Sequence, residues 1–209
     1  MTRLALIIAF GLALLISPQS HAAELDTTVA ALKDGGYVIV IRHFATDDSQ
    51  KDVYPFKYDD MSAQRQLSEK GRDTARALGA ALKTLGIPIG DIYTSRLNRA
   101  VEAGKLMTGR EVTPLESLSD SGAGSASAMA NPDGRNAKAG AALRDLAAAP
   151  PKPGMNNLVV THKTNIADAF GKDMADIREG EALVYKAGAP GSPPAARVQA
   201  EAWIALAGG

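Results

Sequence analysis

The chain has 209 residues, of which 45% are hydrophobic, as expected for one globular domain with a short appendage. Its 23 basic and 23 acidic residues balance, which argues against a nucleic-acid binder or a protein held on an anionic membrane surface. The absence of cysteine excludes disulfides, a thiol nucleophile and a thiolate metal site.

The first 22 residues have the three parts of a secretory signal peptide. Arg3 precedes an apolar run over residues 4–16, and Ser20 to Ala22 form a small-residue cleavage pattern. A spanning helix needs roughly 20 apolar residues, so this shorter run argues against a stable membrane anchor. We therefore expect cleavage after Ala22, a periplasmic or secreted protein, and a single mature domain over residues 23–209.

Loss of the leader would leave the mature chain with two histidines, His43 and His162. Chemistry that requires an imidazole must use one or both of them. Two histidines are too few for a three-ligand zinc site, and the chain has neither a His-Glu-x-x-His nor a Gly-x-Ser-x-Gly motif. We therefore expect no metal and no cofactor.

Helical and strand patterns alternate along the mature chain. Apolar residues at helical spacing, with Ser68 as one N-cap and Gly86 as one stop signal, predict helices over residues 25–33, 68–85, 97–107, 137–149 and 165–170. Apolar runs bounded by turn residues predict strands over residues 38–41, 89–93, 111–114, 157–161, 182–186 and 197–206.

This alternation indicates βαβ crossovers and an α/β fold, a three-layer αβα arrangement with a mostly parallel central sheet. Two segments show no sustained period. The polar residues 46–63 are interpreted as a long loop above the first strand end. The Ser, Gly, Ala and Asn-rich residues 117–136 are either a disordered connection or a lid over the site.

Cations and imidazoles are placed where these elements meet. Arg42 and His43 end the first strand, Arg99 lies in the first turn of a helix, and His162 directly follows a buried strand. Ligands bind at the carboxyl ends of strands in open α/β sheets, because loops and helix N-termini converge there. A phosphoryl group suits this set, since arginine donates planar, charged hydrogen bonds to its oxygens. Helix N-termini after Ser95 and His162 are expected to add backbone N–H donors.

With these residues in hand, the chain resembles the histidine phosphatase superfamily, also called the phosphoglycerate mutase-like family, in a branch of small exported members. The resemblance covers Tyr37 to about Gly171. It rests on four elements of the family. The family motif Arg-His-Gly-x-Thr corresponds to Arg42-His43-Phe44-Ala45-Thr46, and the motif Leu-Ser-x-x-Gly corresponds to Leu67-Ser68-Glu69-Lys70-Gly71. The motif Ser-x-Leu-x-Arg-Ala corresponds to Ser95-Arg96-Leu97-Asn98-Arg99-Ala100, and the late strand followed by a histidine corresponds to Val159-Val160-Thr161-His162.

The resemblance implies a role for each matched residue. His43 would attack phosphorus and carry it as phosphohistidine. Arg42, Arg99 and His162 would hold the phosphoryl oxygens and stabilise the transition state. His43 must be neutral at the attacking nitrogen while His162 works best protonated, so we expect the site to separate their pKa values.

The resemblance also implies a carboxylate on the loop after the Arg99 helix, which protonates the leaving oxygen and then activates water. Asp120 and Glu116 are the candidates, and the spacing of Asp120 from Gly124 favours Asp120. Both side chains are also compatible with solvated loop charges, and some small members lack this acid and act on labile phosphoamidates.

Several neighbouring residues allow more than one interpretation. Phe44 replaces the motif glycine, which suggests a narrower pocket or a ring that stacks on substrate, and we interpret it as a change of specificity. Lys163 and Asn165 either contact substrate or belong to the surface of a helix start. Arg65 and Arg72 are interpreted as solvated helix charges.

Taken together, these features predict a phosphohydrolase acting on a small phosphorylated substrate, a phosphate monoester or phosphoamidate. A mutase is disfavoured, because the chain is short, has a leader and lacks long insertions. The alternative is an inactive relative that binds a phosphate or phospholigand, although pure binding needs no nucleophile.

Overall fold

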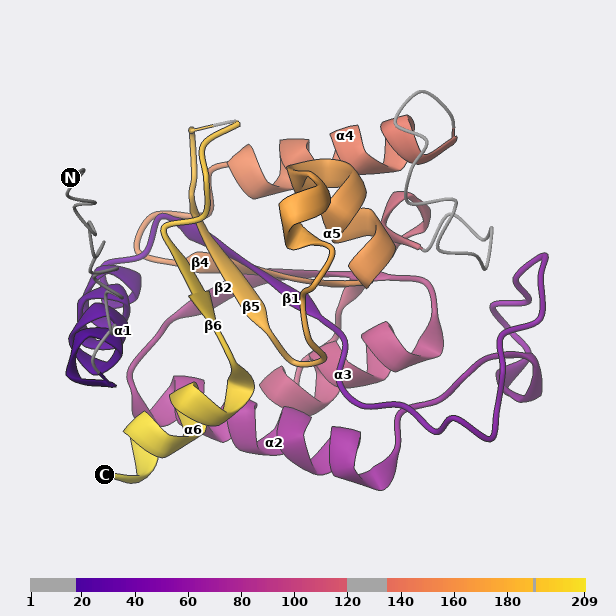
Figure 1. The fold of residues 1–209 in the computed structure, drawn as a ribbon, viewed down its shortest axis with the longest axis horizontal. Helices are drawn as coiled ribbons and strands as arrows, with labels where there is room; N and C mark the ends of the chain where they lie inside the picture. Colours follow the sequence, from indigo (N-terminus) through magenta and orange to yellow (C-terminus); the bar gives the residue numbers. More distant parts are fainter. Residues whose placement is uncertain (1–17, 120–134, 190) are drawn as a thin grey trace, which may run out of the picture.

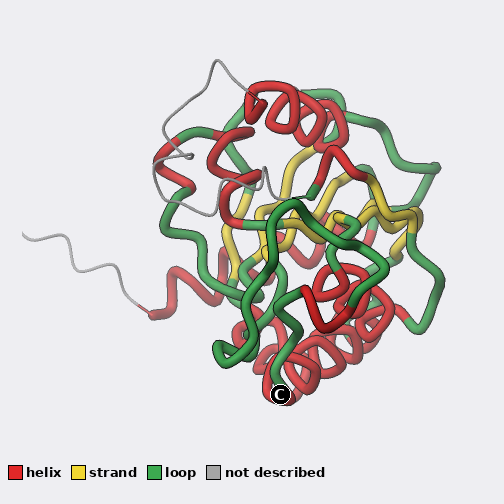
Figure 2. The backbone as a smooth tube through the Cα atoms, turned by 90° about the vertical axis from the view of Figure 1, so that its right-hand side faces the viewer, coloured by secondary structure: helices red, strands yellow, loops and turns green. Residues whose placement is uncertain are grey.

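The computed structural model describes residues 18–119, 135–189 and 191–209, and shows a central sheet between two layers of helices (Figures 1 and 2). The strands are β1 (Tyr37–Arg42), β2 (Ile89–Ser95), β3 (Thr113–Leu115), β4 (Asn156–Thr161), β5 (Ala182–Lys186) and β6 (Ala196–Val198). The helices are α1 (Pro18–Lys33), α2 (Glu69–Thr84), α3 (Asn98–Thr108), α4 (Arg135–Ala148), α5 (Lys163–Phe170) and α6 (Ala200–Gly208), with short 3₁₀ turns at Met61–Ala63, Glu116–Leu118 and Lys172–Met174.

The described strands form one six-stranded sheet in the order β3-β2-β4-β1-β5-β6. β1 pairs in parallel with β4 and antiparallel with β5, and the β5–β6 pair is also antiparallel. The pairs of β2 with β3 and with β4 are parallel. The predicted α/β fold with a mostly parallel sheet is therefore confirmed.

The side chains of β1 alternate between two apolar cores, one on each face of the sheet. Ile39 and Ile41 pack in the cluster that includes side chains of α2, α3 and α6, and Val38 and Val40 pack in the cluster under α4 and α5. Figure 1 shows α2, α3 and α6 on one side of the sheet and α4 and α5 on the other. A strand with both faces covered is expected to be a continuous apolar run, as this one is.

Two predicted elements differ from the structure. Helix α1 begins at Pro18, well before residue 25, and continues across Ala22 and Ala23. The predicted strand over residues 197–206 is wrong beyond Val198, because α6 begins at Ala200. Alanine and leucine are the strongest helix formers in that segment, and the helix buries Trp203 against the core that α2 also lines.

Parts of the sequence-based prediction fall outside the described residues. These parts are the apolar run over residues 4–16 and most of the loop over residues 117–136, including Asp120. Within the described residues, no helix combines the length and the hydropathy that a membrane crossing requires.

Candidate functional site

The pairing register of β1 with β4 brings the two histidines together. Arg42 is paired with Thr161, and the His43 N–H donates to the Thr161 carbonyl at 3.0 Å. His162 follows Thr161 directly, and the ring centroids of His43 and His162 are 5.2 Å apart. Because β1 and β4 are parallel neighbours, residues that follow them must emerge at the same edge of the sheet.

The ring of His43 is buried and held in one tautomer. Its Nδ1 lies 2.8 Å from the carbonyl oxygen of Phe44. A carbonyl can only accept, so Nδ1 carries the proton and the lone pair is left on Nε2. Burial, followed by the nearby Arg99 charge, holds the pKa of His43 well below its usual value, with the Phe44 hydrogen bond opposing the shift. His43 is therefore a neutral imidazole whose Nε2 carries the lone pair.

His162 is fixed by Ser95, the last residue of β2. The Ser95 Oγ lies 2.7 Å from His162 Nε2 and also accepts the Leu97 N–H at 3.2 Å. The Ser95 hydroxyl can donate to Nε2 while it accepts that N–H, and in this arrangement the His162 proton lies on Nδ1. That Nδ1 is buried and has no hydrogen-bond partner in the described part of the chain.

Burial shifts the pKa values of both histidines in the same direction. The pKa of His162 is also well below its usual value, lowered first by burial, then by Arg99 and by His43. Burial and the Arg99 charge therefore disfavour the protonated form of both rings.

Two buried neutral histidines make stability depend on pH. Each binds its proton more weakly in the folded chain than at the unfolded value of 6.5, so the unfolded state takes up more protons below that pH. Their contribution is complete above pH 6.5 and is lost as the pH falls toward the depressed pKa values. We expect Tm to fall between about pH 7 and pH 5 and to fall less steeply in His43→Asn. Equal slopes in the two proteins would contradict the shift assigned to His43.

The Ser95→Ala variant tests how much the orientation of the His162 ring contributes to activity. The variant removes the hydroxyl that bonds to His162 Nε2 and that also accepts the Leu97 N–H. We expect kcat on an aryl phosphate to fall roughly 10-fold, in line with one buried hydrogen bond of about 1.5 kcal/mol. Ser95→Thr, which retains the hydroxyl, should recover most of that loss, and no recovery would mean that Ser95 matters for packing alone.

A turn after α5 holds the guanidinium of Arg42. Arg42 Nη1 donates to the Ile177 carbonyl at 2.8 Å, and Nη2 pairs with Glu179 at 3.3 Å. The Gly180 N–H donates to the carbonyls of Arg42 and His43, which ties the turn to the motif backbone. Burial lowers the pKa of Arg42 and the Glu179 charge opposes this. Arg42 Nε is buried with no hydrogen-bond partner among the described residues.

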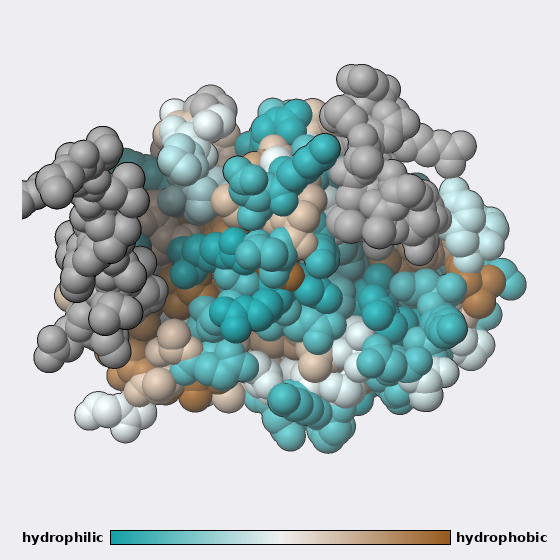
Figure 3. Space-filling view, viewed as in Figure 1, coloured by the Kyte–Doolittle hydropathy of each residue, from teal (hydrophilic) through white to brown (hydrophobic). Residues whose placement is uncertain are grey.

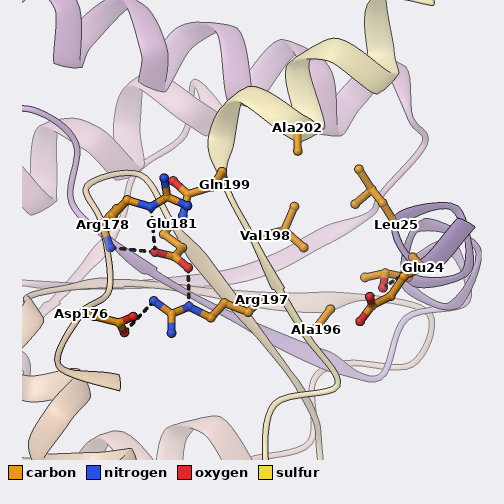
Figure 4. Close-up of a pocket in the computed structure, with 11 residues that line it drawn as sticks. Glu24, Leu25, Asp176, Arg178, Glu181, Ala196, Arg197, Val198, Gln199 and Ala202 are labelled. Carbon is orange, nitrogen blue, oxygen red and sulfur yellow. Dashed lines mark hydrogen bonds and ion pairs between the residues drawn. The ribbon is translucent and has the colours of Figure 1, made fainter. Parts of the chain in front are cut away.

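The far side of the same turn carries an ion-pair network (Figure 4). The buried carboxylate of Glu181 accepts from the Arg178 N–H at 2.7 Å and from the side chain of Arg197, which also pairs with Asp176 at 2.9 Å. These groups line a pocket with residues of α1 and α6, and neither His43 nor His162 lies on its wall. The network therefore supports the turn without entering the histidine site.

Arg99 reaches the site from the first turn of α3, as predicted. Its side chain is only 1% exposed, and its Nη1 donates to Asp52 at 2.9 Å. Asp52 also accepts the Arg65 N–H at 2.9 Å, so one carboxylate fixes Arg99 to the loop between β1 and α2. A buried guanidinium needs such a counter-charge.

Arg65 is a site residue that the sequence analysis missed. It lies in the loop before α2 and not on the helix, and its positive charge lowers the pKa of both His43 and His162. Its Nε is buried and has no hydrogen-bond partner within the described ranges. The only sequence signal is its place two residues before the Leu67-Ser68 motif, which periodicity alone does not reveal. Arg72, by contrast, lies on α2 and pairs with Glu102 of α3 at 2.7 Å.

The motif glycine Gly71 permits a close contact beneath the site. A Cβ at this position would lie 2.1 Å from the Ala45 carbonyl oxygen, which no side chain allows. That carbonyl accepts the Ser68 N–H at 2.9 Å, and the Ser68 hydroxyl in turn caps α2 by accepting the Gly71 N–H at 3.1 Å. The start of α2 therefore packs directly against the chain that leaves His43.

Phe44 lies in the core and not in a substrate pocket. It is 1% exposed, and its ring is so close to Gly180 that a Cβ there would lie 3.0 Å from Cδ1. The expectation that this ring narrows the pocket or stacks on substrate is therefore wrong. Its carbonyl, however, is the group that orients His43.

The N-terminus of α3 is capped by side chains. The N–H groups of Arg96, Leu97 and Asn98 donate to Ser119 Oγ, Ser95 Oγ and Gln64 Oε1, respectively. The expectation that N–H groups after Ser95 bind the anion is therefore wrong for these three. These three N–H groups are already bound within the protein.

The predicted acid has one described candidate. Glu116 is an exposed residue that pairs with Arg96 at 3.2 Å. Asp120 lies outside the described residues, but Ser119 before it is tied to the site by Arg96 and by the Asn165 amide, which donates to its carbonyl at 3.2 Å. Asn165 is buried and supports this segment, whereas Lys163 is the first residue of α5.

No group of three or more His, Cys, Asp or Glu side chains in the described ranges is arranged to hold a metal ion.

Comparison with known proteins agrees with this geometry. Residues 38–137 match the model of the histidine phosphatase superfamily (branch 1). A search of curated proteins found no match.

Solved structures share the fold at low identity. The protein histidine phosphatase SixA complexed with tungstate is 15% identical, with a TM-score of 0.52 over 78% of this chain and 97% of that chain. A mutant phosphoserine phosphatase from Entamoeba histolytica, in complex with phosphoserine, is 14% identical, with a TM-score of 0.54 over 79% and 98%. A mycobacterial glucosyl-3-phosphoglycerate phosphatase complexed with VO3 is 16% identical, with a TM-score of 0.50 over 72% and 92%. At these identities the likeness shows the fold alone.

Proposed function

We propose that this protein is a phosphohydrolase that cleaves a phosphate monoester or phosphoamidate through a phosphohistidine on His43. The observation that carries the proposal is a set of three buried nitrogens without hydrogen-bond partners in the described residues, Arg42 Nε, Arg65 Nε and His162 Nδ1. The charges of Arg42 and Arg65 act on His43, and His162 is its ring neighbour. Buried donors without partners are costly, and the oxygens of a phosphoryl group would satisfy them.

The first step is attack by the lone pair of His43 Nε2 on phosphorus. The P–O or P–N bond to the leaving group breaks as the N–P bond forms, and the leaving atom takes up a proton. Arg42, Arg65 and Arg99 offset the charge on the phosphoryl oxygens, and Nδ1 of His162 donates a hydrogen bond.

The second step transfers the phosphoryl group from His43 to water. Water adds to phosphorus, the N–P bond breaks, and inorganic phosphate leaves with His43 restored as a neutral ring. We assign protonation of the leaving atom, and later activation of water, to Asp120. The exposure of Glu116 and its ion pair with Arg96 make Glu116 the poorer proton donor.

Rapid quench tests this function directly. The protein is mixed with a ³²P-labelled aryl phosphate and quenched in base, and the label on the protein is followed over milliseconds to seconds. We expect an acid-labile, base-stable label on His43 that forms and decays at rates compatible with turnover. Tight binding of inorganic phosphate without label and without turnover of esters or phosphoamidates would instead indicate a non-catalytic phospholigand-binding protein.

We also propose that the leader over residues 1–22 is removed and that the protein acts in the periplasm or outside the cell. The support is the charge and hydropathy pattern of that segment. Intact mass measurement of the protein from its producing cells should give a chain that begins at Ala23. A full-length mass in the cytoplasmic fraction would contradict this.

A further inference from the structure

Exposed apolar side chains concentrate on one loop. Among the described residues, the large hydrophobic side chains that are exposed are Val53 (48%), Tyr54 (55%), Met61 (46%) and Met155 (38%). Three of these four lie between β1 and α2, in the loop that leaves the carboxyl end of β1 beside α3 (Figure 1). Figure 3, in the same view, shows hydrophobic surface at that end of the molecule.

This loop is anchored in the phosphoryl site at both ends. Asp52, directly before Val53, binds Arg99, and Arg65 closes the loop on the other side. Consecutive Cα atoms are about 3.8 Å apart, so Tyr54 lies within roughly 8 Å of Asp52 along the backbone. The buried amide of Gln64 pins the middle of the loop through the Tyr58 carbonyl at 2.9 Å. The apolar side chains are therefore presented on a fixed frame next to Arg99.

Three aromatic rings of the loop form a row. Tyr54 and Phe56 contact edge to face at 5.8 Å, and Phe56 and Tyr58 are 6.2 Å apart. The guanidinium of Arg96 lies 4.1 Å from the centre of the Tyr58 ring, and Arg96 follows Ser95, the partner of His162. The row of rings thus extends from the exposed Tyr54 to the guanidinium of Arg96, the residue after Ser95.

The charges of the loop restrict what this row can bind. Residues 47–60 contain five aspartates, at positions 47, 48, 52, 59 and 60, against two lysines, at positions 51 and 57. Asp52 is paired with Arg99, so four aspartates remain against the two lysines. A second phosphate or a carboxylate on the leaving group would be repelled by this excess. A neutral ring or alkyl chain would contact the aromatic row without that cost.

We propose that the aromatic loop, defined here as Val53, Tyr54, Phe56, Tyr58 and Met61, binds the leaving group of the substrate. The substrate class is then the phosphate monoester of an uncharged aromatic or apolar alcohol. This inference rests on the phosphohydrolase function proposed above and adds the part of the substrate that the arginines do not contact.

The test compares two esters whose alcohols have similar acidity, benzyl phosphate and glycerol phosphate. The wild-type protein should prefer benzyl phosphate in kcat/KM, chiefly through KM. Tyr54→Ala with Phe56→Ala should reduce that preference roughly 10-fold, the effect of losing one to two aromatic contacts. Tyr54→Leu, which retains apolar area, should reduce it less. Met155→Ala removes the fourth exposed apolar side chain, outside this loop, and should leave the preference unchanged.

The outcomes distinguish this inference from the function on which it rests. Turnover of both esters without a preference, or a preference that the double variant retains at an unchanged Tm, would overturn the role of the aromatic loop and leave the phosphohydrolase intact. Failure to hydrolyse either ester, with no label on His43, would overturn the phosphohydrolase and this inference with it.

Discussion

His43→Ala should abolish phosphoryl transfer, with a loss of at least about 10⁴-fold in kcat, because no other side chain replaces a deleted nucleophile. The ring is buried and bonded to the Phe44 carbonyl, so the variant also leaves a cavity and an unpaired acceptor. We therefore expect a lower Tm as well, by the few degrees that about 1–2 kcal/mol produces in a domain of this size.

Two controls separate chemistry from folding in this experiment. His43→Asn keeps a polar side chain of similar reach, and should remain folded and inactive. Both variants should still bind inorganic phosphate or vanadate, because Arg42, Arg65 and Arg99 are retained. Turnover near the wild-type rate in either variant would end the assignment of His43 as nucleophile.

Much of this site is predictable because it follows long apolar strands. His43 and His162 each come one residue after an apolar run, over residues 38–41 and 158–160, and such runs become neighbouring parallel strands in α/β folds. Their meeting at 5.2 Å is therefore a consequence of strand order and register. Arg99 was predictable for a similar reason, since its helix begins immediately after β2.

The contributions of the loop between β1 and α2 were not predictable in this way. Asp52 and Arg65 belong to a polar segment without a period, and Asp52 meets Arg99 across 47 positions of sequence. Contacts of this kind depend on the path of the loop, which the side chain of Gln64 fixes. Its amide donates to the loop carbonyls of Lys57 and Tyr58 and accepts the Asn98 N–H at the start of α3. The motifs point to Arg42 and Arg99, but not to Arg65 as a further cation beside the histidines.

Phe44 shows a second limit of the sequence. At a motif position where glycine is usual, a large ring suggests contact with substrate, yet the direction of a side chain after a strand end is set by the backbone. Here the ring points into the core and packs on Gly180 of the turn that holds Arg42. Phe44 therefore packs the core against the turn that holds Arg42, and its ring does not cover His43.

Arg99→Gln should lower kcat by about 10²–10³, equivalent to roughly 2.7–4 kcal/mol of lost transition-state stabilisation. It should also change the pH dependence. After burial, Arg99 is the largest cause of the lowered pKa of both His43 and His162, so its removal should raise both values. A base with a higher pKa is protonated sooner as the pH falls, and the acid limb of the rate profile should therefore move to higher pH.

The paired variant Asp52→Asn completes the argument for Arg99. The amide keeps an acceptor for Arg99 and for the Arg65 N–H but removes the competing negative charge. If Arg99 binds the phosphoryl group, inorganic phosphate should inhibit Asp52→Asn more tightly and Arg99→Gln more weakly than the wild-type protein. A purely structural Arg99–Asp52 pair would instead lower Tm in both variants and leave the phosphate inhibition constant and the acid limb unchanged. The opposite shifts in phosphate affinity follow only if the guanidinium is shared between the loop carboxylate and the substrate.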